Sequence, residues 1–102
     1  MDRAQALACY RLAAAQGLDE AQWSLGDMYY HGSGVAEDHT EALRWYQLAA
    51  AQGHPWALFD VARCHENGRG VAADVAEAIR WYRRAQAAGM PFAADMLRDL
   101  GA

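Results

Sequence analysis

The apolar positions of this chain recur with the spacing of one face of an α-helix. In DHTEALRWYQLAAAQG, which begins at Asp38, the residues Ala42, Trp45, Tyr46 and Ala49 follow the i, i+3, i+4, i+7 order of such a face. An aspartate stands before this segment and a glycine ends it, which are typical start and end signals. No stretch of alternating Val, Ile or Thr indicates a strand. The pattern predicts an all-α fold with helices at residues 3–16, 19–31, 39–52, 55–66, 75–88 and 91–100.

The same pattern returns after a shift of 36 residues, so that Trp45-Tyr46 is repeated as Trp81-Tyr82. Internal repeats of this length are typical of helical solenoids. A Gly-x-Gly-Val loop between helices also occurs twice, at Gly32, Gly34 and Val35 and again at Gly68, Gly70 and Val71. No strand pattern precedes either loop, and the lysine of a phosphate-binding loop is missing. We therefore interpret both loops as structural turns rather than as nucleotide sites.

The repeated residues resemble the Sel1-like repeat, a relative of the tetratricopeptide repeat. The family pattern is Ala-x-x-x-Leu-Gly-x-x-Tyr-x-x-Gly-x-Gly-Val-x-x-Asp, followed by Ala-x-x-Trp-Tyr and Ala-Ala-x-x-Gly. It is matched at Ala21, Leu25, Gly26, Tyr29, Gly32, Gly34, Val35, Asp38, Ala42, Trp45, Tyr46, Ala49, Ala50 and Gly53. The second unit begins at Ala57 and departs from the pattern at Val61, Ala62 and His65. The resemblance covers nearly the whole chain.

This resemblance implies a right-handed α-solenoid of three antiparallel helix pairs, which binds other proteins and has no catalytic chemistry of its own. We expect one repeat domain over residues 1–102. In the phase of the family, full units lie at 21–53 and 57–89. A helix without its partner then lies at each end, at 1–17 and 90–102.

Composition and charge narrow the partner classes. The net charge is −4, and acidic and basic residues are interspersed, so no basic stripe indicates nucleic-acid binding. No apolar run is long enough to span a membrane, and the first ten residues do not have the pattern of a signal peptide. The two cysteines, Cys9 and Cys64, form no CxxC motif. Both are expected to fill the core as small apolar residues.

No arrangement of residues predicts catalysis. The two serines lie outside a Gly-x-Ser-x-Gly motif. The acids Asp27, Asp60, Asp95 and Asp99 are expected on solvated helix surfaces. The four histidines, His31, His39, His54 and His65, are scattered over loops and helix ends. We therefore predict no enzyme, no metal site and no cofactor.

A candidate partner surface lies opposite the apolar stripe of the Leu-Gly helices. On a helical wheel, Trp23, Asp27 and Tyr30 point away from the core direction set by Ala21 and Leu25. Resemblance to tetratricopeptide arrays places this surface on the concave side. The predicted binding residues are Trp23, Asp27, Tyr30, Trp56, Phe59, Arg63 and Asp95. Aromatic residues and arginine dominate binding hot spots. For Trp23 and Phe59, burial between neighbouring helices is an equally compatible interpretation.

The sequence favours a protein-interaction module that presents a preformed surface to a peptide or a partner protein. One alternative is homo-oligomer formation through the end helices. Their apolar residues are Leu7, Tyr10, Leu12 and Ala14 in the first and Met90, Phe92, Met96 and Leu100 in the last. A second alternative is a weak β-lactam hydrolase, by analogy with cysteine-rich relatives. This chain lacks the cysteine pairs of those relatives.

Overall fold

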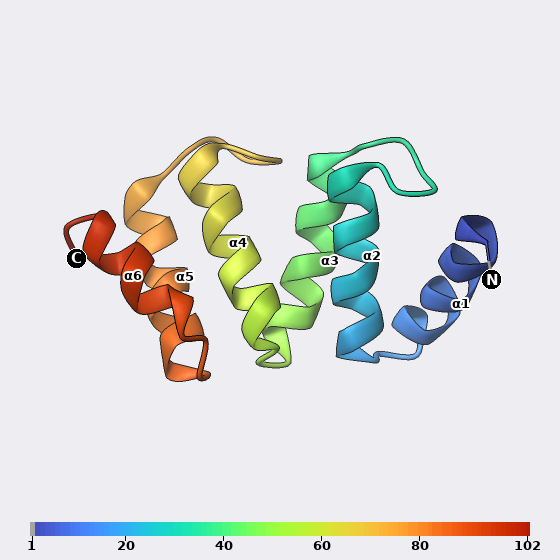
Figure 1. The fold of residues 1–102 in the computed structure, drawn as a ribbon, viewed down its shortest axis with the longest axis horizontal. Coiled ribbons are helices and arrows are strands. Elements are labelled where there is room, and N and C mark those ends of the chain that lie inside the picture. The colour runs from blue at the N-terminus through green and yellow to red at the C-terminus, as the bar shows by residue number, and fades with distance from the viewer. Residues whose placement is uncertain (1) are drawn as a thin grey trace.

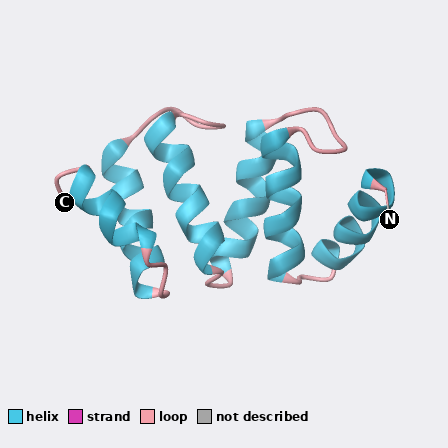
Figure 2. Ribbon diagram, viewed as in Figure 1, coloured by secondary structure: helices cyan, strands magenta, loops and turns pink. Residues whose placement is uncertain are grey.

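The computed structural model describes residues 2–102, and these form six helices and no strand (Figures 1 and 2). The helices are α1 (Arg3–Ala15), α2 (Asp19–His31), α3 (His39–Ala51), α4 (Pro55–Asn67), α5 (Val75–Ala87) and α6 (Phe92–Asp99). All six predicted helices are confirmed, with ends that agree within one residue. Consecutive helices run up and down along a row (Figure 1), and the molecule measures 43 × 24 × 18 Å.

Helix starts follow the 36-residue repeat. Asp2, Asp38 and Asp74 precede α1, α3 and α5, and the side chain of each accepts a hydrogen bond from the backbone N–H three residues later. This bond satisfies one of the N–H groups that a helix start leaves unpaired. In α1, the backbone N–H of Asp2 also donates to the side chain of Gln5. Local capping therefore fixes where each odd-numbered helix begins.

The Gly-x-Gly-Val loops connect each even-numbered helix to the next odd-numbered one and also touch an earlier part of the chain. Gly34 and Gly70 both have a φ of +80°, which favours glycine. A Cβ at Gly70 would lie 2.5 Å from the carbonyl oxygen of His39, at the start of α3. A Cβ at Gly34 would lie 3.1 Å from the Cβ of Arg3, at the start of α1. Each loop is thus pressed against the odd-numbered helix of the preceding unit.

Small residues allow the helices of a pair to approach closely. A Cβ at Gly26 in α2 would lie 2.6 Å from the ring of Tyr46 in α3, so a larger residue would push these helices apart. The residue equivalent to Gly26 in α4 is Ala62, which is fully buried. In α6 it is Arg98, whose side chain is 75% exposed. Because of its size, Arg98 disfavours an odd-numbered helix packing on α6 as α3 packs on α2.

Some core predictions are confirmed and others are wrong. Cys64 is buried as expected, but Cys9 is exposed. Of the apolar residues of α1 that were expected to be uncovered, Leu12 is 68% exposed, whereas Ala14 is buried. Trp45, the residue equivalent to Cys9, packs against the apolar cluster between α1 and α2. No earlier helix lies against Cys9 among the described residues, so Cys9 lacks the neighbours that partly cover Trp45.

The residues expected to be unshielded near α6 also differ from one another. Met90 is buried, and Met96 and Leu100 are half-buried against the core. Phe92 is 53% exposed. The apolar surface of this end is therefore smaller than the sequence pattern suggests.

Candidate functional site

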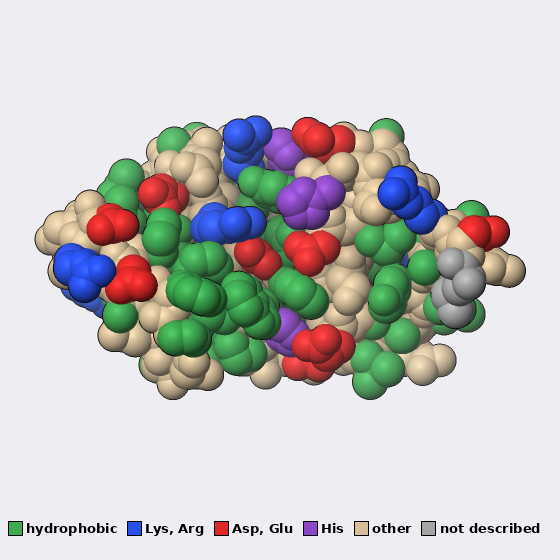
Figure 3. All heavy atoms as spheres, viewed as in Figure 1, with side chains coloured by type: hydrophobic (Ala, Val, Ile, Leu, Met, Phe, Trp, Pro, Cys, Tyr) green, Lys and Arg blue, Asp and Glu red, His purple; other side chains and the backbone are tan. Residues whose placement is uncertain are grey.

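The predicted binding residues come from the three even-numbered helices. In the view of Figure 1, α6 lies in front of α5, and the same view in Figure 3 shows one face with apolar, acidic, basic and histidine side chains. Apolar side chains gather in its lower part, over α4 and toward α6. Trp23, Asp27, Tyr30 and Arg63 are half-buried, Trp56 and Asp95 are exposed, and Phe59 is buried. The predicted set thus contains both surface residues and one core residue.

Five side chains form a continuous row, which we call the aromatic row: Tyr30, Arg63, Phe59, Trp56 and Phe92. The guanidinium carbon of Arg63 lies 5.8 Å from the ring centre of Tyr30 and 5.9 Å from that of Phe59. The rings of Phe59 and Trp56 are 6.2 Å apart, and those of Trp56 and Phe92 are 6.1 Å apart. These are ordinary separations for cation–π and aromatic pairs. The row therefore runs from α2 across α4 to α6.

Two histidines extend the row beside Tyr30. The ring of His39 lies 4.7 Å from that of Tyr30, and the ring of His31 lies 5.0 Å from it. His39 also pairs with the carboxylate of Glu37 at 3.2 Å. One end of the aromatic row therefore has basic side chains beside it, and the other end has two exposed aromatic rings.

Two of the predicted binding residues lie outside the row. Asp27 accepts a short hydrogen bond of 2.5 Å from the hydroxyl of Tyr46, a fully buried residue of α3. Burial, together with the nearby carboxylates of Asp60 and Asp27, raises the pKa of Tyr46, so its hydroxyl stays protonated. Asp95 pairs with Arg98 on α6 at 2.9 Å. The prediction that these aspartates belong with the aromatic anchors has no contact to support it.

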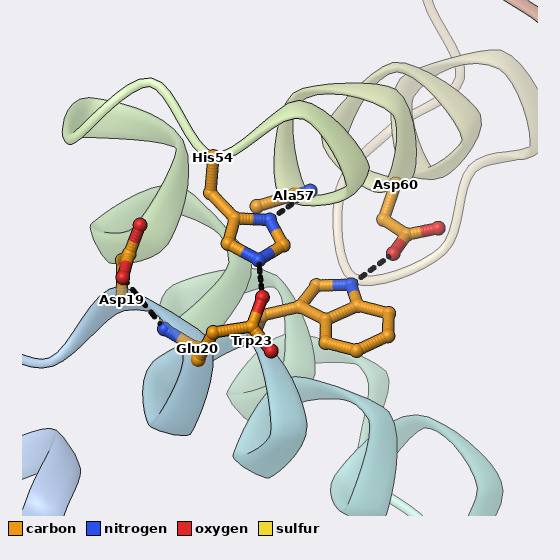
Figure 4. A network of polar contacts seen from close by, with 6 residues as sticks. All are labelled: Asp19, Glu20, Trp23, His54, Ala57 and Asp60. Carbon is orange, nitrogen blue, oxygen red and sulfur yellow. Dashed lines mark hydrogen bonds and ion pairs between the residues drawn. The ribbon is translucent and has the colours of Figure 1, made fainter. Parts of the chain in front are cut away.

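Asp60 was expected on a solvated surface, and this prediction is wrong. Only 6% of Asp60 is exposed. Its carboxylate accepts a 2.8 Å hydrogen bond from the indole N–H of Trp23 (Figure 4). It also pairs with Arg63 at 3.3 Å. Burial raises the pKa of Asp60 from 3.8 to about 6, against the opposing effects of Trp23 and Arg63. A buried carboxylate of this kind is costly when ionised, so it protonates more readily than an exposed one.

His54 lies beside the same contact, and sequence reasoning did not single it out. It is buried, and its ring stacks on Trp23 at 5.4 Å. Its Nδ1 accepts the backbone N–H of Ala57 and thereby caps α4, while Nε2 lies 2.5 Å from a carboxylate oxygen of Glu20 (Figure 4). The available signal was its place directly before Pro55, because a polar residue there can cap a helix.

Several kinds of site are absent from the part of the chain that the structure describes. Residues 2–102 contain no pocket and no group of three or more His, Cys, Asp or Glu side chains placed to hold a metal ion. Within the same residues, every helix is too short or too polar to cross a membrane.

Comparison with known families identifies the repeat. The model of the Sel1 repeat matches residues 2–18, 19–54 and 57–90. This chain belongs to the Sel1 repeat family. Sel1 repeats are typically protein–protein interaction modules, and their fold is generally a non-catalytic scaffold. No curated protein matches the chain.

Solved structures show the same architecture. A Sel1 repeat protein from Oxalobacter formigenes is 38% identical, with a TM-score of 0.90 over 94% of this chain. The protective antigen c5321 of uropathogenic Escherichia coli strains is also 38% identical, with a TM-score of 0.92 over 94% of this chain. This Sel1 chain spans 39% and 21% of those two proteins.

A third solved structure is more distant in sequence. Cysteine-rich protein B of Helicobacter pylori is 20% identical to this chain and has a TM-score of 0.90. The match covers 95% of this chain and 73% of that protein. At this identity the likeness concerns the fold alone.

Proposed function

We propose that this Sel1 chain binds a protein or peptide partner on the face formed by its even-numbered helices, and that the aromatic row is the centre of the contact. The observation that supports this proposal is the continuity of the row across α2, α4 and α6. Exposed aromatic rings that lie in contact with a buried one are held in place before a partner arrives. Such preorganisation lowers the entropy cost of binding.

The members of the row contribute in different ways. Trp56 is 43% exposed and Phe92 is 53% exposed, so these two rings can bury apolar surface against a partner. Phe59 lies beneath them at 8% exposure and packs edge-to-face on Tyr82 at 5.4 Å. Arg63 keeps part of its guanidinium exposed and can donate hydrogen bonds. Aromatic anchors then supply affinity, and Arg63 supplies orientation.

The test compares capture of the same partner by matched variants. Bacterial lysate is passed over the immobilised wild-type chain, and the proteins retained are quantified by mass spectrometry. Trp56→Ala with Phe92→Ala should reduce retention of the main partner at least tenfold. Leu48→Ala is the control, because Leu48 lies on the odd-numbered helix α3 and is 45% exposed. Equal retention by the double variant, or loss with Leu48→Ala alone, would place the binding surface elsewhere.

Self-assembly through the end helices has less support. A contact between α6 of one copy and α1 of another would bring Arg98 to the position where Gly26 and Ala62 allow close approach. The formation of a homo-oligomer stays a prediction, which sedimentation velocity over a concentration series would test. The β-lactam hydrolase alternative rests on the resemblance alone.

A further inference from the structure

The repeat gives this molecule two equivalent contacts between neighbouring even-numbered helices, and their chemistry differs. We call the contact of α2 with α4 the first junction, formed by Glu20, Trp23, His54 and Asp60. The residues 36 positions later are Trp56, Phe59, Met90 and Met96, and we call their place between α4 and α6 the second junction. Here Trp56 contacts Phe92 of α6, and Phe59 and Met90 belong to one buried cluster, against which Met96 packs. Every polar or charged position of the first junction is therefore occupied by an apolar side chain in the second.

The first junction is held together by contacts that involve two carboxylates and one imidazole. Three contacts of these residues cross from α2 to α4: the indole hydrogen bond of Trp23 to Asp60, the stacking of Trp23 on His54, and the pair of His54 with Glu20. Each depends on a carboxylate or on an imidazole. The second junction has no titratable side chain among its four residues.

Asp60 is the carboxylate of the first junction with the least access to water: it is 6% exposed, whereas the side chain of Glu20 is 76% exposed. The charged or titratable groups near it come from four elements. Asp27 lies on α2, Tyr46 on α3 and Tyr82 on α5. His54 caps α4, and Arg63 and Cys64 lie within that helix. Arg63 favours the charged form of Asp60, and Asp27 disfavours it. Burial acts in the same direction as Asp27 and outweighs the opposing effects of Trp23, Arg63 and His54, so a proton on Asp60 relieves an unfavourable charge.

We propose that the first junction is a proton-sensitive joint: a proton on Asp60 tightens the contact between α2 and α4, and loss of that proton loosens it. An ionised Asp60 gains hydration when the helices separate, and a neutral Asp60 does not. The neutral acid still has an oxygen that can accept the indole N–H of Trp23. The closed contact therefore binds a proton more tightly than the open one, and acid favours the closed contact.

His54 acts on the same contact through its two nitrogens. In the observed arrangement Nδ1 is an acceptor for Ala57, so the proton of the neutral ring is on Nε2, facing Glu20. A second proton would make Nδ1 a donor and end the cap of α4, while it would strengthen the pair with Glu20. The effect of Asp60 must therefore be measured separately from that of His54.

The joint would regulate the proposed binding face, and this consequence rests on the proposed function. Proton uptake by Asp60 removes the partner of Arg63, a member of the aromatic row, and takes one negative charge from the face. A bound partner that contacts Arg63 should then be held with an affinity that changes between pH 5 and 7. The joint itself needs no partner and can be tested in the isolated chain.

The indole N–H of Trp23 reports directly on Asp60. The chain has four tryptophans, which give four indole resonances in a nitrogen-15 correlation spectrum. The Trp23 resonance should move with a midpoint near pH 6 in the wild type and should not do so in Asp60→Asn. Trp56, whose ring lies against those of Phe59 and Phe92, is the internal reference. A Trp23 resonance that stays constant from pH 4.5 to 7.5, or that moves equally in Asp60→Asn, would overturn the proposal.

Two measurements on the wild type keep the test decisive if Asp60→Asn fails to fold. The carbon-13 resonance of the Asp60 carboxyl should titrate with the same midpoint as the Trp23 indole. Amide hydrogen exchange, corrected for intrinsic rates, should show protection of α2 falling about tenfold or more between pH 5 and 7, with α6 unchanged. Equal protection of α2 at both values would refute the joint. A partner affinity that stays constant between pH 5 and 7, while α2 still shows this pH response, would refute only the regulated function.

Discussion

The first and second junctions of this Sel1 chain hold equivalent helices of one repeat, yet one is polar and the other is apolar. Trp23 faces a carboxylate and an imidazole, whereas Phe59, its equivalent, packs on Tyr82 in the core. The helices, the aspartate caps of the odd-numbered helices and the Gly-x-Gly-Val loops follow the same plan in both units. The comparison shows that the repeat requires certain residues within each helix pair and leaves the contact between neighbouring pairs free to vary.

Removal of the ring at the centre of the apolar contact should have the largest effect on stability. Phe59→Ala deletes a buried ring that touches Trp56, Arg63 and Tyr82. We expect a loss of about 3–5 kcal/mol in the free energy of unfolding. Since no titratable group replaces the ring, the loss should be similar at pH 5 and pH 7. Urea unfolding followed by circular dichroism measures both values, and a loss under about 1 kcal/mol would show that Phe59 is not part of the core.

The polar contact should make stability depend on pH. The pKa of Asp60 is about 6 in the folded chain and ordinarily 3.8, so the folded state holds this proton more tightly. The stabilisation by this proton is fully present below about pH 3.8 and is lost as the pH rises through about 6. It amounts to at most about 3 kcal/mol. The measurement is the unfolding free energy of the wild type minus that of Asp60→Asn. This difference should fall by a few kcal/mol at most as the pH rises from 4 to 7. A constant difference would contradict the prediction.

Replacement of Trp23 by phenylalanine, the residue at the equivalent position of α4, should have an intermediate effect on stability. Trp23→Phe places the residue of the second junction in the first and removes the only indole donor to Asp60. We expect a loss of about 1–3 kcal/mol at pH 7, because a buried carboxylate is left without this hydrogen bond. The loss should be smaller at pH 5, where Asp60 is protonated. Chemical unfolding at the two pH values measures it, with Phe59→Trp as the reciprocal control. A larger loss at pH 5 would reverse the assigned role of Asp60.

Substitution of Asp95, at the equivalent position of α6, should have the smallest effect on stability. Asp95 corresponds to Trp23 and Phe59, but its carboxylate is exposed and pairs only with Arg98, one turn along the same helix. An exposed pair of this kind contributes little, so Asp95→Ala should change stability by no more than about 0.5 kcal/mol. The melting temperature should likewise stay within a few degrees of the wild type. A larger loss would mean that a contact beyond this pair depends on Asp95.

The sequence was sufficient to predict the helices because the residues that mark each helix boundary recur in more than one copy of the repeat. Asp38 and Asp74 mark equivalent helix starts, and Gly32 and Gly68 mark equivalent ends. An error in one copy would conflict with the other. The period also gives the direction of each side chain around its own helix, which is why Tyr46 was placed correctly in the core.

Other features depend on what lies beside a helix, and one helix period does not contain this information. Asp60 points toward a neighbouring even-numbered helix rather than toward water, whereas its charge had grouped it with surface acids such as Asp99. Cys9 shares its position with Trp45 but not the neighbours that partly cover Trp45. The residues equivalent to Asp60 are Ser24 and Met96, so this position holds a hydroxyl, a carboxylate or a thioether. The repeat itself therefore does not determine the side chain here, and this variation was a signal that Asp60 need not be an ordinary surface acid.

The Gly70 loop has a mechanical consequence. It presses on the start of α3, at the end of the molecule where the long loops lie (Figure 1). The starts of α2 and α4, which carry Glu20 and His54, lie at the opposite end, beside the short turns (Figure 1). The backbone contact at His39 can serve as a pivot, and the polar contacts of the first junction hold α2 and α4 together at the end away from this pivot. When these polar contacts are lost, α2 and α4 should rotate apart about this pivot rather than slide past one another. A small change in protonation would then become a change in the curvature of the whole array.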